Sequence, residues 1–264
     1  MKKIILGIFS AITFSILTIS IAFALPNNVG VNKAKEVSPA INEEGVVVAP
    51  PEFVLQLPES RLTKVVFIRY APGKAPKCDN DGICEAGENS KNCQNDCPAN
   101  DETSACYGFL SGAKPKWNWV EDYHYSTSTL ALPTTLAVSI WEGATAAEIF
   151  GNGFLGSFNW GIYDYKNAVS YGNYSDPNVL AVTAIWFQGK NIYEYDIMMD
   201  TDYFPNAGTP DSNTVVLHEF GHAAGLDDLY NSACLDNVMY GYYHGEDLDL
   251  GTGDIFGIQK LYGI

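Results

Sequence analysis

The chain has 264 residues, of which 47% are hydrophobic and 17% charged, so it can build an apolar core and is not wholly disordered. Acidic residues outnumber basic residues by 31 to 15, which gives a formal net charge of −16. Because nucleic-acid phosphates are bound by basic surfaces, this charge excludes nucleic acid as a partner. The 16 Tyr and 24 Gly residues favour a domain rich in strands and loops over a helical bundle.

The N-terminus has the pattern of a secretory signal peptide. Lys2 and Lys3 precede an apolar run from Ile4 to Ala24, which ends in Ala-Phe-Ala. An uncleaved membrane anchor is the alternative, because the run is nearly long enough to span a bilayer. We expect residues 1–24 to be removed, which leaves a secreted chain with no stable insertion in the membrane.

The next segment, residues 25–77, reads as an irregular N-terminal or pro-region. Its apolar stretches are interrupted by prolines at positions 26, 39, 50, 51 and 58, as in a linker or a loosely ordered arm. Within this segment, Val65–Tyr70 is rich in β-branched and aromatic residues and predicts a strand.

The six cysteines suggest disulfides, since an even number in an exported chain favours pairing over free thiols. Four of them lie close together in an acidic segment, residues 78–97, and we expect two local bridges among Cys78, Cys84, Cys93 and Cys97. A structural zinc is the weaker alternative, because paired C-x-x-C spacing is absent. Clustered carboxylates in this segment could bind calcium, and a merely solvated acidic loop is an equal alternative. Cys106 and Cys234 are left over, and we expect them to pair.

Residues 106–264 have the dense apolar composition of one ordinary domain. Apolar residues from Leu136 to Ala144 recur at helical spacing after Pro133. Two strands follow, Leu180–Phe187 and Ile192–Met199, joined by a Gly-containing turn. A second helix should begin near residues 211–213, which are of types that commonly cap helix N-termini, and should end at residue 225. Gly253–Leu261 predicts a last short helix. This order of elements predicts an α+β domain.

The second of these helices carries the motif H-E-x-x-H. His218 and His222 are four residues apart, so both imidazoles leave the same helix face and can bind one metal ion. Glu219 lies beside them, placed to take a proton from the water that a bound metal activates. Gly225 allows the chain to turn back, which would bring Asp228 to the ion as a third ligand.

These residues carry a family resemblance. The pattern H-E-x-x-H-x-x-G-x-x-D, followed by Val238-Met239-Tyr240, resembles the zinc helix, glycine turn and Met-turn of metzincin zinc peptidases. Within the metzincins the chain is most similar to the matrixins, through three further segments. Trp141–Thr145 resembles the end of their first helix, and Leu180–Thr183 resembles their substrate-pairing edge strand. Gly253–Gly263 resembles their closing helix. The resemblance covers roughly residues 106–264.

The resemblance implies a metzincin-like catalytic domain, with a twisted mixed sheet, a zinc helix and a C-terminal helix. It implies one catalytic Zn²⁺ held by His218, His222 and Asp228, and an apolar floor formed by Met239. It also implies that extended substrate pairs with the edge strand at Leu180, Ala181 and Val182, and that Tyr240 and Tyr242 line the pocket after the scissile bond.

The sequence departs from the matrixin pattern in three ways. The third ligand is Asp228 where matrixins usually have His, a change shared with snapalysin-like peptidases. The cysteine-switch motif PRCGxPD of matrixin pro-regions is absent. The remaining histidines, His124 and His244, lie far from the positions of the family's second zinc site, and we read them as ordinary, partly exposed residues.

The expected function is therefore that of a secreted, monomeric zinc endopeptidase that acts on proteins or peptides. The alternative is a surface binding module on a catalytically inactive peptidase fold. A dead relative would be expected to lose its general base, and Glu219 is retained.

Overall fold

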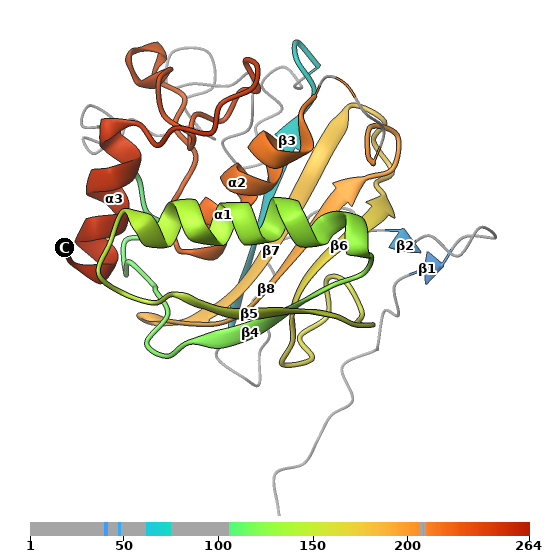
Figure 1. The fold of residues 1–264 in the computed structure, drawn as a ribbon, viewed down its shortest axis with the longest axis horizontal. Coiled ribbons are helices and arrows are strands. Elements are labelled where there is room, and N and C mark those ends of the chain that lie inside the picture. The colour runs from blue at the N-terminus through green and yellow to red at the C-terminus, as the bar shows by residue number, and fades with distance from the viewer. Residues whose placement is uncertain (1–39, 42–46, 49–61, 75–105, 206–207, 209) are drawn as a thin grey trace, which may run out of the picture. The chain divides into compact units, whose positions relative to one another are not determined.

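In the computed structural model, the described residues are 40–41, 47–48, 62–74, 106–205, 208 and 210–264. Figure 1 shows their helices and strands. The strands are β1 (Ala40–Ile41), β2 (Val47–Val48), β3 (Thr63–Tyr70), β4 (Glu121–Tyr125), β5 (Phe150–Leu155), β6 (Asn167–Asn173), β7 (Val179–Gln188) and β8 (Asn191–Asp200). The helices are α1 (Ala131–Gly143), α2 (Ser212–Ala223) and α3 (Thr252–Tyr262), with 3₁₀ turns at Ser128–Leu130 and Ser232–Cys234.

The described strands form one mixed sheet in the order β1-β2-β6-β8-β7-β3, and β4 and β5 continue it beside β6. β7 runs antiparallel to both of its neighbours, β8 and β3, whereas β6 is parallel to β2, β4 and β8. β7 and β8 are joined by the predicted turn, in which Gly189 has φ +58°. The α+β class expected from the sequence is confirmed.

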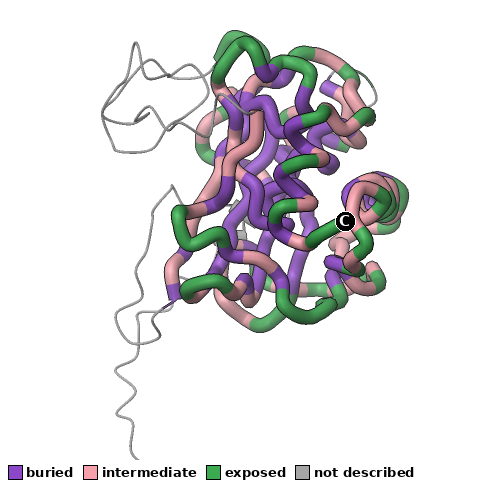
Figure 2. Tube along the Cα trace, turned by 90° about the vertical axis from the view of Figure 1, so that its left-hand side faces the viewer, coloured by how far each residue is buried: buried purple, intermediate pink, exposed green. Residues whose placement is uncertain are grey.

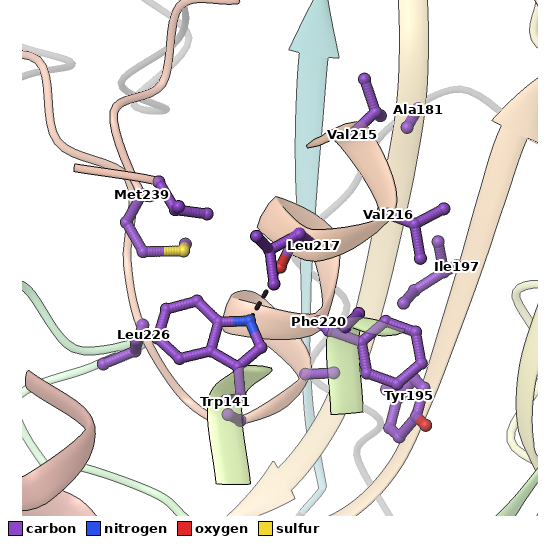
Figure 3. Close-up of a cluster of buried hydrophobic side chains, with 14 of the residues drawn as sticks. Trp141, Ala181, Tyr195, Ile197, Val215, Val216, Leu217, Phe220, Leu226 and Met239 are labelled. Atoms are coloured by element: carbon purple, nitrogen blue, oxygen red, sulfur yellow. Dashed lines mark hydrogen bonds between the residues drawn. The ribbon is translucent and has the colours of Figure 1, made fainter. Parts of the chain in front are cut away.

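One face of the sheet is covered by α1 and α2 (Figure 1). β7 and β8 are buried almost without interruption, so β7 is buried on both faces, and their apolar residues supply the core between sheet and helices. Figure 2 shows buried residues along the strands and helices and exposed residues mainly in the connecting loops. Figure 3 shows this core around Trp141, whose indole Nε1 donates to the carbonyl of Leu217 over 2.8 Å. The bond fixes α1 against the middle of α2.

A disulfide joins Cys106 to Cys234 across a sequence separation of 128 residues. It ties the start of the domain to the loop between α2 and α3, as expected from the sequence. The signal peptide at 1–24 and the cysteine-rich segment at 78–97 lie outside the described residues. Within the described part of the chain, no helix has the length and apolar character needed to cross a membrane.

The predicted elements occur close to their expected positions. The strand expected at Val65–Tyr70 is β3, and the helix expected from residue 211 is α2, which is N-capped by Asp211. The stretch expected to be irregular also contains the short strands β1 and β2.

Candidate metal centre and active site

α2 is buried along most of its length, from Thr214 to Ala223. Its first turn is closed by the carboxylate of Asp211, which accepts a hydrogen bond from the backbone N–H of Thr214 over 2.8 Å. α1 packs on one side of this helix and β7 on another. The sequence places chemically active residues on α2, and the fold places α2 in the interior.

The close packing of α2 requires glycine at position 221. A Cβ built on Gly221 would lie 2.2 Å from Sδ of Met239 and 2.7 Å from the indole of Trp141. Both distances are shorter than any real contact, so a larger side chain would push the helix away from the Met-turn. Met239 therefore packs directly against α2 at Gly221, and Figure 3 shows it beside the helix, near Leu217 and Trp141.

The chain leaves α2 through Gly225, which has φ +103°. This left-handed conformation is unfavourable for other residues, and a Cβ here would also lie 2.4 Å from the carbonyl oxygen of Pro115. The turn returns the chain toward the helix and brings Asp228 next to the two histidines.

The three predicted ligands converge on one point. Nε2 of His218 lies 3.1 Å and Nε2 of His222 lies 3.6 Å from Oδ1 of Asp228. One ligand atom from each residue falls within 4.8 Å of the other two. Two imidazole nitrogens and one carboxylate oxygen are a donor set that suits zinc.

The backbone fixes the tautomer of both imidazoles. Nδ1 of His218 lies 2.7 Å from the carbonyl oxygen of Val238, and Nδ1 of His222 lies 3.0 Å from that of Leu226. Because a carbonyl only accepts, each Nδ1 must carry the proton, which leaves the lone pair on Nε2. Burial lowers the pKa of His218 to about 3, and it also lowers the pKa of His222. Both rings are therefore neutral at physiological pH and ready to bind metal.

Asp228 has one satisfied and one unsatisfied carboxylate oxygen. The phenol of Tyr230 donates to Oδ2 over 3.0 Å. Oδ1 is buried and has no hydrogen-bond partner among the described residues, although it faces both Nε2 atoms. Burial acts to raise the pKa of Asp228, but any proton on His222 or His218, together with the charge of Arg69, lowers it below its usual range. An ionised, unpartnered oxygen that faces two imidazole lone pairs fits a divalent cation.

Glu219 lies on the same helix but outside this ligand set. Its Oε2 accepts a hydrogen bond from the hydroxyl of Thr183 in β7 over 2.6 Å. Its Oε1 is buried without a partner among the residues that the structure describes. Burial raises the pKa of Glu219 to about 8, against the opposing effects of Thr183 and Arg69. A carboxylate with one oriented oxygen and one free oxygen can take and return a proton.

The Met-turn is held by α3. The carboxylate of Asp254, which is 1% exposed, accepts hydrogen bonds from the backbone N–H groups of Val238 over 2.6 Å and Met239 over 3.1 Å. Val238 also supplies the carbonyl that orients His218. The C-terminal helix thus helps to position the first histidine through the backbone of the Met-turn.

β7 does not lie at the edge of the sheet, which corrects one sequence-based expectation. Leu180, Ala181 and Val182 are fully buried, because β3 pairs with β7 along its whole length. Sequence reasoning identified β3 as a strand, but its pairing partner is more than a hundred residues away and no local pattern indicates it. The edge expected to receive substrate is therefore occupied by the protein's own chain.

The aromatic residues after Met239 lie beside the site. Tyr240 is buried and stacks obliquely against Tyr242, which in turn contacts Tyr230. Asp227, the neighbour of the third ligand, is outside the metal cluster and accepts a hydrogen bond from the backbone N–H of Asp228. His124 and His244 are likewise outside the cluster.

Four residues near the site were not identified from the sequence as site residues: Phe67, Arg69, Thr183 and Tyr230. Three of them contact an expected ligand or Glu219, and Arg69 contacts the backbone of Tyr240, only because the sheet and loops bring distant segments together. The one available signal was the hydroxyl at position 183 within an otherwise apolar strand, since a buried hydroxyl needs a partner.

Comparisons with known proteins agree with this geometry. Residues 159–263 match the family model described as matrixin. A putative matrix metalloproteinase of Trichoplusia ni ascovirus 2c is 30% identical over 102 residues, 38% of this chain and 17% of that relative. Matrilysin of Rattus norvegicus is 48% identical over 52 residues, 19% of this chain and 18% of the relative. The chain thus spans less than a fifth of the length of each relative.

Proposed function

Because the domain is a matrixin-like metzincin, we propose that this protein is a zinc-dependent endopeptidase. The observation that carries the proposal is the unpartnered, buried Oδ1 of Asp228, which faces Nε2 of both His218 and His222. Such an arrangement is costly in the absence of a cation and is explained by one. These three side chains would hold the zinc.

The chain's own residues divide the remaining work. When bound, zinc supplies a Lewis acid that polarises the scissile carbonyl and acidifies water. Glu219 accepts the proton of the attacking water on Oε1 and delivers it to the leaving amine, while Thr183 keeps Oε2 in place. Met239 provides an apolar floor, which keeps the ligands in a dry, rigid site.

Substrate would bind in extended form. A peptide strand would take the place of β3 and pair with the backbone of Leu180–Thr183, since strand addition is a common mode of peptide recognition. Tyr240 and Tyr242 would contact side chains on the far side of the scissile bond. We therefore expect the peptidase to prefer extended, unfolded protein as its substrate, because a folded segment cannot add a strand to the sheet.

We propose export by the N-terminal segment 1–24, which precedes the catalytic domain in the chain. The alternative function, an inactive binding module, is disfavoured by the retention of Glu219 and by its hydrogen bond to Thr183. A binding module has no need of a buried carboxylate held in this orientation.

The test is chelator-reversible hydrolysis of an unfolded protein by purified full-length chain. The ring of Phe67 stacks on His222, and Arg69 contacts the backbone of Tyr240, so both side chains can obstruct substrate in the wild type. The assay should therefore include a Phe67→Ala/Arg69→Ala variant beside the wild type. Hydrolysis that disappears with chelator and returns with zinc supports the proposal. Metal-independent hydrolysis, or none by either protein after zinc loading, would contradict it.

A further inference from the structure

The proposed active site is closed to solvent. Glu219 is 0% exposed, and His218 and His222 are each 1% exposed. A peptide bond cannot reach Oε1 of Glu219 while these side chains are covered. If the proposed peptidase function is right, part of the structure must move before substrate binds.

β3 is the element that covers the site. It pairs antiparallel with β7, with Phe67 opposite Thr183, Ile68 opposite Val182 and Arg69 opposite Ala181. These are the positions of β7 to which an extended substrate would add its strand. β3 therefore takes up the main-chain hydrogen-bonding groups that a substrate needs.

Two side chains of β3 reach the proposed site. The ring of Phe67 stacks on the imidazole of His222, with a centroid distance of 3.8 Å and an interplanar angle of 9°. Nη1 of Arg69 donates to the carbonyl oxygen of Tyr240 over 3.3 Å. One side chain covers a metal ligand, and the other enters the region expected to receive a substrate side chain.

Arg69 also acts through its charge. Burial lowers the pKa of this guanidinium, and the carboxylates of Glu219 and Asp228 counteract that effect. The side chain is 4% exposed, so its charge is compensated mainly by these two carboxylates.

A third contact anchors β3 away from the catalytic residues. Nζ of Lys64 donates to the carbonyl oxygen of Gly161 over 2.8 Å and lies 4.7 Å from the ring centroid of Trp186. A cation–π contact of this kind helps to hold β3 on β7 without occupying the active site. β3 is thus held at both of its ends.

We propose that residues 62–74 are an internal inhibitor that occupies the substrate groove, with Phe67 and Arg69 as the blocking side chains. The site becomes available when β3 leaves β7. Residues 62–74 contain no cysteine, so the block works by strand pairing, ring stacking and the hydrogen bond of Arg69, and not by a thiolate on the metal. The inference rests on the proposed function, because it names the regulation of the same site.

The experiment compares four zinc-loaded, full-length proteins: wild type, a release variant, a lock variant and a control. The release variant, Phe67→Ala/Arg69→Ala, loses the two blocking side chains. The lock variant, Val66→Cys/Ala184→Cys, places cysteines at positions that are opposite each other in the β3–β7 register. The control, Thr63→Ala, changes β3 at its end opposite Phe187 and away from the metal ligands.

Two measurements are made on each protein. One is binding of a fluorescein-labelled peptide with the sequence of residues 62–74, and the other is hydrolysis of a quenched fluorescent peptide. The release variant should bind the probe and hydrolyse the substrate at least about tenfold better than wild type, because a larger fraction has an open groove. The control should match the wild type. The oxidised lock variant should neither bind the probe nor hydrolyse the substrate. Mild reductant should restore probe binding and hydrolysis in the lock variant without changing either in the wild type.

The outcomes separate the two claims. Probe binding by the release variant without hydrolysis would leave this inference standing and overturn the peptidase function. Equal probe binding and equal hydrolysis in wild type, release and oxidised lock variants would overturn the inference and leave the peptidase function standing. If the release variant does not fold, the lock variant decides, because an oxidised lock that binds the probe or hydrolyses the substrate as well as its reduced form contradicts the block.

Discussion

The hydroxyl of Thr183 in β7 donates a hydrogen bond to Oε2 of Glu219 in α2 over 2.6 Å. The two residues are 36 positions apart in sequence, and both are 0% exposed. The bond fixes the rotamer of the proposed general base and leaves its other oxygen free. It also favours the ionised form of the carboxylate, since a donor stabilises negative charge.

Replacing Thr183 should therefore change the pH dependence of catalysis. Thr183→Val keeps the shape and removes the donor, so the pKa of Glu219 rises and the acidic limb of kcat/KM moves to higher pH. A hydrogen bond to a charged group is worth about 1.5–3 kcal/mol, so activity below neutral pH should fall about tenfold or more. Thr183→Ser, which retains the hydroxyl, is the control. A Thr183→Val profile that superimposes on the wild-type profile would exclude this role.

Asp228, and not Asp227, should control metal content. Asp228→Ala removes the unpartnered oxygen that faces both imidazoles, so it should lose zinc and the thermal stability that bound metal contributes. Asp227→Ala is the matched control and should retain both to a much greater extent. Metal analysis by mass spectrometry and thermal unfolding provide the measurements. Full zinc in Asp228→Ala with depletion in Asp227→Ala would refute the assignment.

Gly221 should tolerate no side chain. Gly221→Ala places a methyl group against Sδ of Met239 and the indole of Trp141, which should lower the free energy of unfolding by about 1–3 kcal/mol. Gly143→Ala is the matched control, because a Cβ at Gly143 meets nothing within 4 Å. Urea unfolding of the two variants measures the difference. Similar midpoints would show that the Met-turn can move away from α2 at little cost.

A buried glutamate in β8 should make stability depend on pH. Burial raises the pKa of Glu194 to about 8, although the backbone N–H groups of residues 164, 165 and 166 oppose the shift. The folded state binds the proton on Glu194 more tightly than the unfolded state does. The contribution of Glu194 to the free energy of unfolding is therefore fully present below about pH 4.5 and is lost as pH rises through 8. Relative to Glu194→Gln, the wild type should lose stability across this range.

The exposed residue Glu148 provides the control for that comparison. Unfolding midpoints should be measured at several pH values for wild type, Glu194→Gln and Glu148→Gln. Glu148→Gln should follow the wild type at each pH. Parallel pH curves for wild type and Glu194→Gln would show that Glu194 does not titrate in this way.

The sequence allowed the metal ligands to be proposed because they lie within one helix and the turn that follows it. A spacing of four residues places His218 and His222 on one face, and Gly225 indicates where the chain turns back toward Asp228. These relations are local, so they can be read without knowledge of the tertiary fold. The helices and central strands were predictable for the same reason.

The covering of the site was not predictable in this way. Phe67 and His222 come into contact because β3 pairs with β7, and pairing between distant strands leaves no periodic signal in either segment. The resemblance to matrixins indicated an open edge at Leu180–Val182, and only the strand register shows that it is filled. The hydrogen bond from Tyr230 to Asp228 likewise depends on the path of a loop.

The central claim is that a metal held by His218, His222 and Asp228 works together with Glu219 as the proton carrier. The most direct measurement determines zinc content and peptide hydrolysis together, in the Phe67→Ala/Arg69→Ala background with and without Glu219→Gln. We predict equal zinc in both proteins and a loss of hydrolysis of at least about a hundredfold with Glu219→Gln, because proton transfer is removed while the metal ligands stay intact. Unchanged hydrolysis in Glu219→Gln, or the loss of its zinc, would contradict the account.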